Sequence, residues 1–120
     1  MTRLRFPRSA RLTQGAEFAR VRAEGRSEHG RFMVCSVVQI GGDEAVRIGF
    51  ITSRRVGSAV VRNRVRRRLR EIVRADRARL PGGCWVVLVA RAGAAAATFT
   101  ALQEEWRRLA KRAGLLVLGA

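Results

Sequence analysis

Acidic residues are scarce in this sequence, with nine Asp and Glu against 25 Lys and Arg, and the formal net charge is +16. A surplus of this size in 120 residues predicts an anionic partner, and nucleic acid is the first candidate. All the basic residues except Lys111 are arginine, whose planar guanidinium group suits phosphate better than an ammonium group does. The length predicts a single domain over residues 1–120.

Other absences exclude several kinds of site. Two cysteines, Cys35 and Cys84, and one histidine, His29, are too few for a zinc site. We expect both thiols to be small apolar side chains in strands rather than a disulfide. No apolar run approaches the roughly 20 residues of a membrane span, and the basic start lacks the apolar run of a signal peptide. These features predict a cytoplasmic protein without a membrane partner.

The few acids also argue against a catalytic centre within the protein. Metal-assisted phosphodiester cleavage needs clustered carboxylates, and no DxD-like pattern stands in a predicted strand. His29 lies beside a glycine and has no evident acid–base partner. We therefore predict no catalytic residue and no metal ion bound by the protein alone.

Apolar patterning predicts an α+β sandwich, in which one sheet packs with helices. The GGDE stretch between the first two strands has the composition of a hairpin connection. The first strand is apolar on both faces, so we expect the sheet to be covered on both sides. The expected elements are a basic extended segment at 1–11, a helix from the cap Thr13 to Glu24, strands at 31–40 and 45–53, a helix over 59–74 capped by Ser58, a strand at 84–90, a helix over 98–114 capped by Thr98, and an apolar tail at 114–120.

The stretch VVRNRVRRRLREIVR, residues 60–74, holds seven arginines and one acid, Glu71. At about 100° per residue its aliphatic side chains fall on one side of a helix and its arginines on the other side and both edges. Like charges four residues apart cost a few tenths of a kcal/mol each, which a bound polyanion would relieve. Arg54 and Arg55 precede the helix N-terminus, where the dipole and free amides also attract phosphate. A solvated charged face and a helix lying on lipid are the alternatives, but the stripe is narrow and aliphatic, which favours docking on a sheet.

Single-stranded nucleic acid is usually held by a basic groove with aromatic rings on which bases stack. Four of the aromatic residues, Phe50, Trp85, Phe99 and Trp106, have the pattern of core residues. Phe18 differs, because it lies on a short predicted helix among arginines. Core packing and ligand stacking are equally compatible with its position.

The stretch IGFITSRRVGSAVVRNRVRRRLREIVR closely resembles the signature of the bacterial ribonuclease P protein subunit, and the similarity extends over roughly residues 8–112. The resemblance implies a two-layer α+β sandwich with a mostly antiparallel sheet and a left-handed βαβ crossover. It also implies binding to a catalytic RNA subunit and to the 5′ leader of precursor tRNA, with no DNA partner. Chemistry would belong to the RNA and its Mg²⁺. A structural RNA-binding protein of the ribosomal type and an autonomous nuclease remain the alternatives.

The resemblance also assigns residues by position. Those matching the RNA-binding region are Arg54, Arg55, Arg62, Asn63, Arg64, Arg66, Arg67 and Arg70. Those expected in a leader cleft beside the first helix are Phe18, Arg22, Met33 and Cys35. The family often has aromatic residues where this chain has Arg22 and Cys35, so we expect its cleft to depend less on stacking and more on charge.

Overall fold

The computed structural model describes residues 10–42 and 44–116. The predicted N-terminal segment and C-terminal tail fall largely on residues 1–9 and 117–120, outside these ranges. The elements are α1 (Gly15–Glu24), β1 (Arg26–His29), β2 (Met33–Gln39), β3 (Arg47–Thr52), η2 (Arg54–Val56), α2 (Ala59–Asp76), η3 (Arg77–Arg79), β4 (Cys84–Ala90), η4 (Ala92–Ala95) and α3 (Phe99–Arg112). None of the helices in the described part of the chain is long and apolar enough to cross a membrane.

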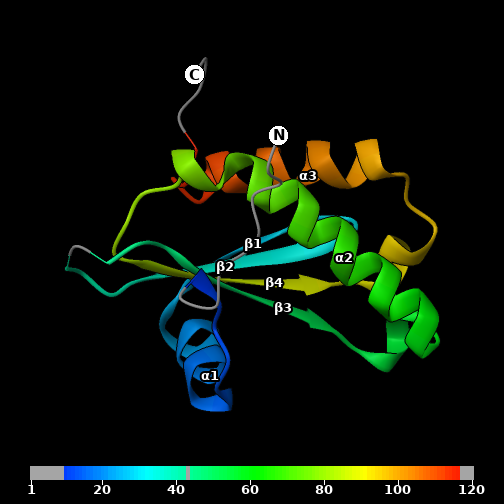
Figure 1. The fold of residues 1–120 in the computed structure, drawn as a ribbon, viewed down its shortest axis with the longest axis horizontal. Coiled ribbons are helices and arrows are strands. Elements are labelled where there is room, and N and C mark those ends of the chain that lie inside the picture. Colours follow the sequence, from blue (N-terminus) through cyan, green and yellow to red (C-terminus); the bar gives the residue numbers. More distant parts are fainter. Residues whose placement is uncertain (1–9, 43, 117–120) are drawn as a thin grey trace, which may run out of the picture.

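The four strands form one mixed sheet in the order β1-β2-β4-β3. β1 pairs with β2, and β2 with β4, in antiparallel fashion, whereas β3 and β4 run parallel. The helix α2 therefore connects two neighbouring parallel strands, as in the βαβ unit that the resemblance implied. Figure 1 shows α2 and α3 on one side of the sheet and α1 on the other. The predicted α+β architecture with a mostly antiparallel sheet is confirmed.

The hairpin predicted between the strands at 31–40 and 45–53 is wrong. These strands are β2 and β3, and β4 lies between them in the sheet. The connecting segment instead closes on Gly83, whose carbonyl oxygen accepts from the backbone N–H groups of Ile40 and Gly41 at 2.7 and 3.0 Å. Gly83 has a φ of 73°, a conformation that favours glycine. β4 takes the central place because it is apolar on both faces. The composition of the GGDE turn does not show that β4, rather than β3, pairs with β2.

The core divides into one cluster on each face of the sheet. Toward α2 and α3, the aliphatic stripe of α2 packs against inward residues of β2 and β4. Toward α1, Val21 and Leu12 pack against Val38 and Val87, with Phe18 and Trp85 at the margin. The expectation that both sheet faces are covered is therefore confirmed. The α2 residues fully buried in the larger cluster are Val65, Leu69, Ile72 and Val73.

Capping side chains set the ends of the long helices. Ser58 accepts from the backbone N–H of Val61 at 3.3 Å, and Thr98 accepts from that of Ala101 at 3.0 Å, so both predicted caps are confirmed. For α1 the N-cap position is Gln14 rather than the predicted Thr13. The prediction for α3 needs one correction, because Phe99 is 38% exposed although Leu102, Trp106 and Leu109 of the same stripe are buried.

Candidate nucleic-acid interface

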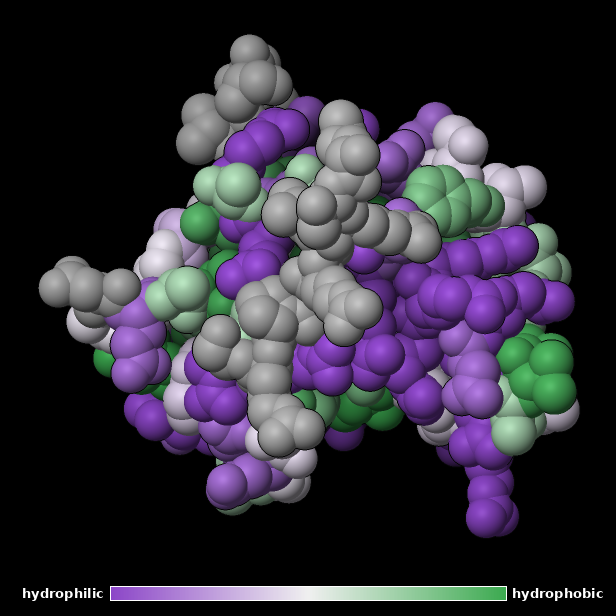
Figure 2. Space-filling view, viewed as in Figure 1, coloured by the Kyte–Doolittle hydropathy of each residue, from purple (hydrophilic) through white to green (hydrophobic). Residues whose placement is uncertain are grey.

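The helix α2 presents its arginines on the outside of the molecule. Its aliphatic stripe is buried against the sheet and α3, so the opposite side and both edges carry the charge. In Figure 2 a broad hydrophilic surface lies over this part of the structure. Arg54 and Arg55 are exposed in η2, just before the α2 N-terminus, and extend the charge to that end. The structure therefore brings the eight predicted RNA-binding residues together along one helix and the turn that precedes it.

One edge of α2 faces the chain segment that leads into α3. The Nη2 group of Arg64 donates to the carbonyl oxygen of Ala95 at 3.1 Å, and the Nη1 group of Arg68 donates to that of Ala97 at 3.2 Å. Both acceptors are neutral, so these bonds orient the guanidinium groups without cancelling their charge. The sequence analysis did not single out Arg68, although it belongs to the same surface.

The other edge of α2 faces β3. Arg66 donates from Nη2 to the hydroxyl oxygen of Thr52 at 2.6 Å and from Nη1 to the amide oxygen of Asn63 at 3.3 Å. Arg67 lies between the two edges and is exposed. Arg74, near the end of the helix, differs because it pairs with Glu71. Among the ion pairs of the described residues, none joins an acid to Arg62, Arg64, Arg66, Arg67, Arg68 or Arg70.

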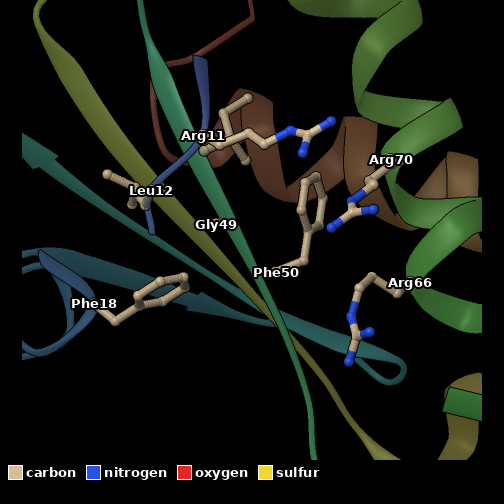
Figure 3. Close-up of a pocket in the computed structure, with 8 residues that line it drawn as sticks. Arg11, Leu12, Phe18, Gly49, Phe50, Arg66 and Arg70 are labelled. Atoms are coloured by element: carbon tan, nitrogen blue, oxygen red, sulfur yellow. The ribbon is translucent and has the colours of Figure 1, made fainter. Parts of the chain in front are cut away.

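A pocket of about 200 Å³ lies where Arg11 and Leu12 meet α1, β3 and α2. The rings of Phe18 and Phe50 and the guanidinium groups of Arg11, Arg66 and Arg70 lie around it, as labelled in Figure 3. Arg11 and Leu12 lie along the outer edge of β3, where the backbone N–H of Leu12 donates to the carbonyl oxygen of Ile48 at 3.0 Å. The lining residues are Arg11, Leu12, Phe18, Ile48, Gly49, Phe50, Arg66 and Arg70.

Phe18 both packs and lines this pocket. Its half-buried ring lies on Gly49, and a Cβ atom added to that glycine would stand only 2.3 Å from the ring atom Cε1. Glycine is therefore required there for the ring to approach the strand. Phe50 is half-buried: it packs against the larger core cluster, as the sequence pattern predicted, and it also lines the pocket. The strand pattern could not identify it, because β3 is an edge strand whose partner surface comes from distant parts of the chain.

The pocket is strongly electropositive. Burial, followed by the charges of Arg11 and Arg66, lowers the pKa of Arg70 from its ordinary value. Burial is the larger cause of this lowered pKa; the charges of Arg11 and Arg66 add to it, and an anion placed among the three arginines would relieve their repulsion. Proteins that bind single-stranded nucleic acid hold it with this combination of aromatic ring faces and basic groups.

Two of the four predicted cleft residues are wrong. Met33 and Cys35 have 0% exposed surface and pack toward α2 and α3, on the sheet face opposite α1. Burial raises the pKa of the Cys35 thiol to about 12, in keeping with an apolar core position. Arg22 is exposed on α1 one turn after Phe18 but does not line the pocket.

The buried carboxylates serve the fold. Asp76 accepts from the indole N–H of Trp106 at 2.9 Å, and Glu105 accepts from the backbone N–H groups of Arg31 and Phe32 at 2.6 and 2.7 Å. Within residues 10–42 and 44–116, no three His, Cys, Asp or Glu side chains form a group that could hold a metal ion.

Comparison with known proteins agrees with this description. A family model described as Ribonuclease P matches residues 6–114. The ribonuclease P protein component of Syntrophomonas wolfei is 35% identical over 113 residues, 94% of each chain. That of Gluconacetobacter diazotrophicus is 40% identical over 109 residues, 90% of this chain and 94% of the other.

Solved structures share the fold. The RNase P protein of Staphylococcus aureus superposes with a TM-score of 0.84 at 24% identity, over 92% of this chain and 100% of the other. The RNase P protein of Thermotoga maritima superposes with a TM-score of 0.71 at 28% identity, over 93% of this chain and 97% of the other.

The fold and the arginine surface define a small α+β protein suited to holding a nucleic acid. The matches then identify it more closely: the chain belongs to the Ribonuclease P family. Membership associates it with ribonuclease P, an endoribonuclease, and gives no support to the alternative of a structural protein of the ribosomal type.

Proposed function

We propose that this chain binds the catalytic RNA subunit of ribonuclease P and assists removal of the 5′ leader from precursor tRNA. The observation that carries the proposal is a row of six arginines on α2 that form no ion pair with an acid of the described residues: Arg62, Arg64, Arg66, Arg67, Arg68 and Arg70. The RNA subunit supplies the missing negative charge. Release of counterions from its phosphates drives binding.

The proposal assigns cleavage to the RNA and its Mg²⁺ rather than to protein side chains. In support, the buried acids Asp76 and Glu105 are held in structural hydrogen bonds, away from the arginine surface. The protein contributes by screening the repulsion between the two RNAs, which lowers the Mg²⁺ concentration needed for binding. This role places the protein in the cytoplasm, with the precursor tRNA.

We also propose that the single-stranded leader passes beside α1, where Phe18 stacks on a base. The pocket that Phe18 lines supports this, because it joins rings to guanidinium groups. A paired RNA backbone would be held by charge alone and would gain nothing from the rings.

A three-part cleavage assay tests the proposal. Precursor tRNA is incubated at low Mg²⁺ with the purified protein, with the RNA subunit, and with both together. We expect leader removal only in the combined sample. Cleavage by the protein alone would instead indicate an autonomous nuclease. Binding to RNA without any gain in cleavage would indicate a structural RNA-binding protein.

A further inference from the structure

Thr52 is a buried polar residue at the point where β3 ends beside α2. It is the last residue of β3, lies opposite Ala90 of β4 and is 7% exposed. Its hydroxyl oxygen accepts from the Nη2 group of Arg66 at 2.6 Å, a shorter bond than those that Arg64 and Arg68 make with backbone carbonyl oxygens, at 3.1 and 3.2 Å. A short bond from a charged donor is among the stronger hydrogen bonds in proteins. The sheet therefore holds one arginine of the charged helix through a side chain that lies inside the protein.

Arg66 is held from two sides. Its Nη1 group donates to the amide oxygen of Asn63, three residues earlier on α2, at 3.3 Å, while Thr52 holds Nη2 from the sheet. Acceptors on both terminal nitrogens fix the plane of the guanidinium group, and its remaining N–H donors stay available to a ligand. The half-buried side chain extends from α2 toward β3 in Figure 3. Arg66 is therefore ordered before any partner binds.

Both acceptors are neutral, so they orient Arg66 and leave its charge intact. None of the ion pairs among the described residues includes Arg66. A carboxylate in the position of Thr52 would order the guanidinium group equally well, but it would cancel the charge that attracts phosphate. A long side chain that must be immobilised during binding reduces affinity, and this cost is avoided when the fold has already ordered it. A neutral hydroxyl thus suits a cationic group that is prepared for an anion.

We propose that Thr52 is a positioning residue, which touches no RNA and prepares Arg66 to receive an RNA phosphate. The inference rests on the proposed function and adds to it a buried residue without charge. A phosphate of the RNA subunit and one of precursor tRNA have the same chemistry, and separate binding measurements distinguish them. The hydroxyl acts only through Arg66, so its removal should matter only while Arg66 is present.

The test compares two substitutions of Thr52 that differ in the hydroxyl. Thr52→Val keeps the branched shape and the strand preference but removes the acceptor, whereas Thr52→Ser keeps the acceptor. Each is made in the full chain, and Thr52→Val is also combined with Arg66→Ala. Two affinities are measured for every protein: that for the RNA subunit, and that of the RNA subunit saturated with protein for precursor tRNA. Urea denaturation gives the unfolding midpoint of each variant.

Thr52→Val should weaken binding of the RNA that Arg66 contacts by about two- to tenfold, the factor gained by ordering one long side chain in advance. Thr52→Ser should bind as the unaltered protein does. Beside Arg66→Ala, Thr52→Val should cause no further loss of affinity, because the side chain that it orients is gone. A residue that serves packing alone would cause the same loss with and without Arg66.

The dependence of affinity on salt separates orientation from charge. Arg66→Ala should reduce the slope of log affinity against log salt by about 0.7 to 0.9 for the RNA that Arg66 contacts, because one phosphate contact is lost. Thr52→Val removes no charge, so the affinity that it loses should be nearly the same at every salt concentration. An unchanged slope for Arg66→Ala with both RNAs would show that Arg66 meets no phosphate, and would overturn the proposal.

Two further results would overturn the role of Thr52. Undiminished affinity of Thr52→Val for both RNAs would show that Arg66 is oriented without the hydroxyl, and a loss that persists beside Arg66→Ala would assign Thr52 to packing. If Thr52→Val proves too unstable to measure, Thr52→Ser and Thr52→Ala make the same comparison, because they differ by the hydroxyl alone. Failure of the proposed function itself would look different, because the unaltered protein would then not bind the RNA subunit.

Discussion

The Nη1 group of Arg47, the first residue of β3, donates to the carboxylate of Glu17 on α1 at 2.7 Å. Its Nη2 group donates to the carbonyl oxygen of Arg11 at 2.9 Å, and its guanidinium lies 5.4 Å from the centre of the Trp85 ring. Arg47 therefore ties α1 and the backbone at Arg11 to the sheet. Phe18 follows Glu17 directly, so two pocket residues owe their positions to this one side chain.

Arg47→Ala should lower the free energy of unfolding by about 2 kcal/mol, because it removes hydrogen bonds to a charged group and to a carbonyl at a partly buried site. It should also weaken binding of precursor more than binding of mature tRNA, since Arg11 and Phe18 lose their support. Chemical denaturation and the two affinities measure both effects. Arg20→Ala is the control: Arg20 also lies over Trp85, at 5.5 Å, but its ion-pair partner among the described residues is the exposed Glu24. An equal loss in that control would show that Arg47 acts through its charge alone.

Stability should depend on pH through Glu17. Hydrogen bonding from the backbone N–H of Gln14, and then from Thr13 and Arg47, lowers the pKa of the Glu17 carboxyl below its ordinary 4.5, although burial acts in the opposite direction. A carboxyl whose pKa is lower in the folded state stabilises it above the unfolded pKa, and this contribution is lost as pH falls through the folded value.

The difference in unfolding free energy between the unaltered protein and Glu17→Gln should therefore be constant near neutral pH and shrink below about pH 5. Urea denaturation at a series of pH values measures it. A difference that stayed the same down to about pH 2 would mean that the carboxylate contributes nothing through its charge.

Phe18→Ala should reduce affinity for precursor by about 1 to 3 kcal/mol if a base stacks on the ring. Mature tRNA, which has no leader, should bind as before. Binding measurements with the two RNAs, together with the unfolding midpoint of the variant, distinguish stacking on a leader base from packing in the core. Equal losses for both RNAs, or a fall in stability alone, would show that Phe18 serves packing and not the leader.

Gly49→Ala should impair the leader site without removing the ring. The added Cβ atom would stand 2.3 and 2.5 Å from two ring atoms of Phe18, so the ring must swing away from β3. We expect a loss of precursor affinity close to that of Phe18→Ala, and little further loss when both changes are combined. Additive losses would indicate that the glycine and the ring act separately.

Changing Arg62, Arg64 and Arg67 together to alanine should weaken RNA-subunit binding and flatten its dependence on salt. Each lost phosphate contact reduces the slope of log affinity against log salt by about 0.7 to 0.9, so three contacts account for about 2 to 3 units. Arg64 also holds Ala95, and the unfolding midpoint of the variant shows whether that docking bond matters to the fold. An unchanged slope would show that these three arginines do not contact phosphates of the RNA subunit.

The helices of this protein could be predicted because their signals are local. Leu69 and Val73 are four residues apart on one side of α2, and Ser58 and Thr98 cap helices within their own segments. Such features depend on neighbours along the chain and survive in any tertiary arrangement. The charged face of α2 followed from the same periodicity.

The sheet and the pocket depend on contacts that local patterns do not contain. Met33 and Cys35 had to share a face, but β2 is apolar on both faces, so alternation could not say which face meets α1. β1 escaped notice because its four residues, Arg26–His29, are polar and lie at the sheet edge. The pocket joins Arg11, Phe50 and Arg70, which only the folded chain brings together.

The place of β4 between β2 and β3 has a consequence for biosynthesis. A ribosome releases α2 before β4, so the strand that completes the sheet emerges after the basic helix. Until residue 90 is free, β3 lacks its neighbouring strand and α2 lacks much of the surface on which its aliphatic stripe rests. A growing chain therefore carries its arginine helix before the surface on which that helix docks is complete.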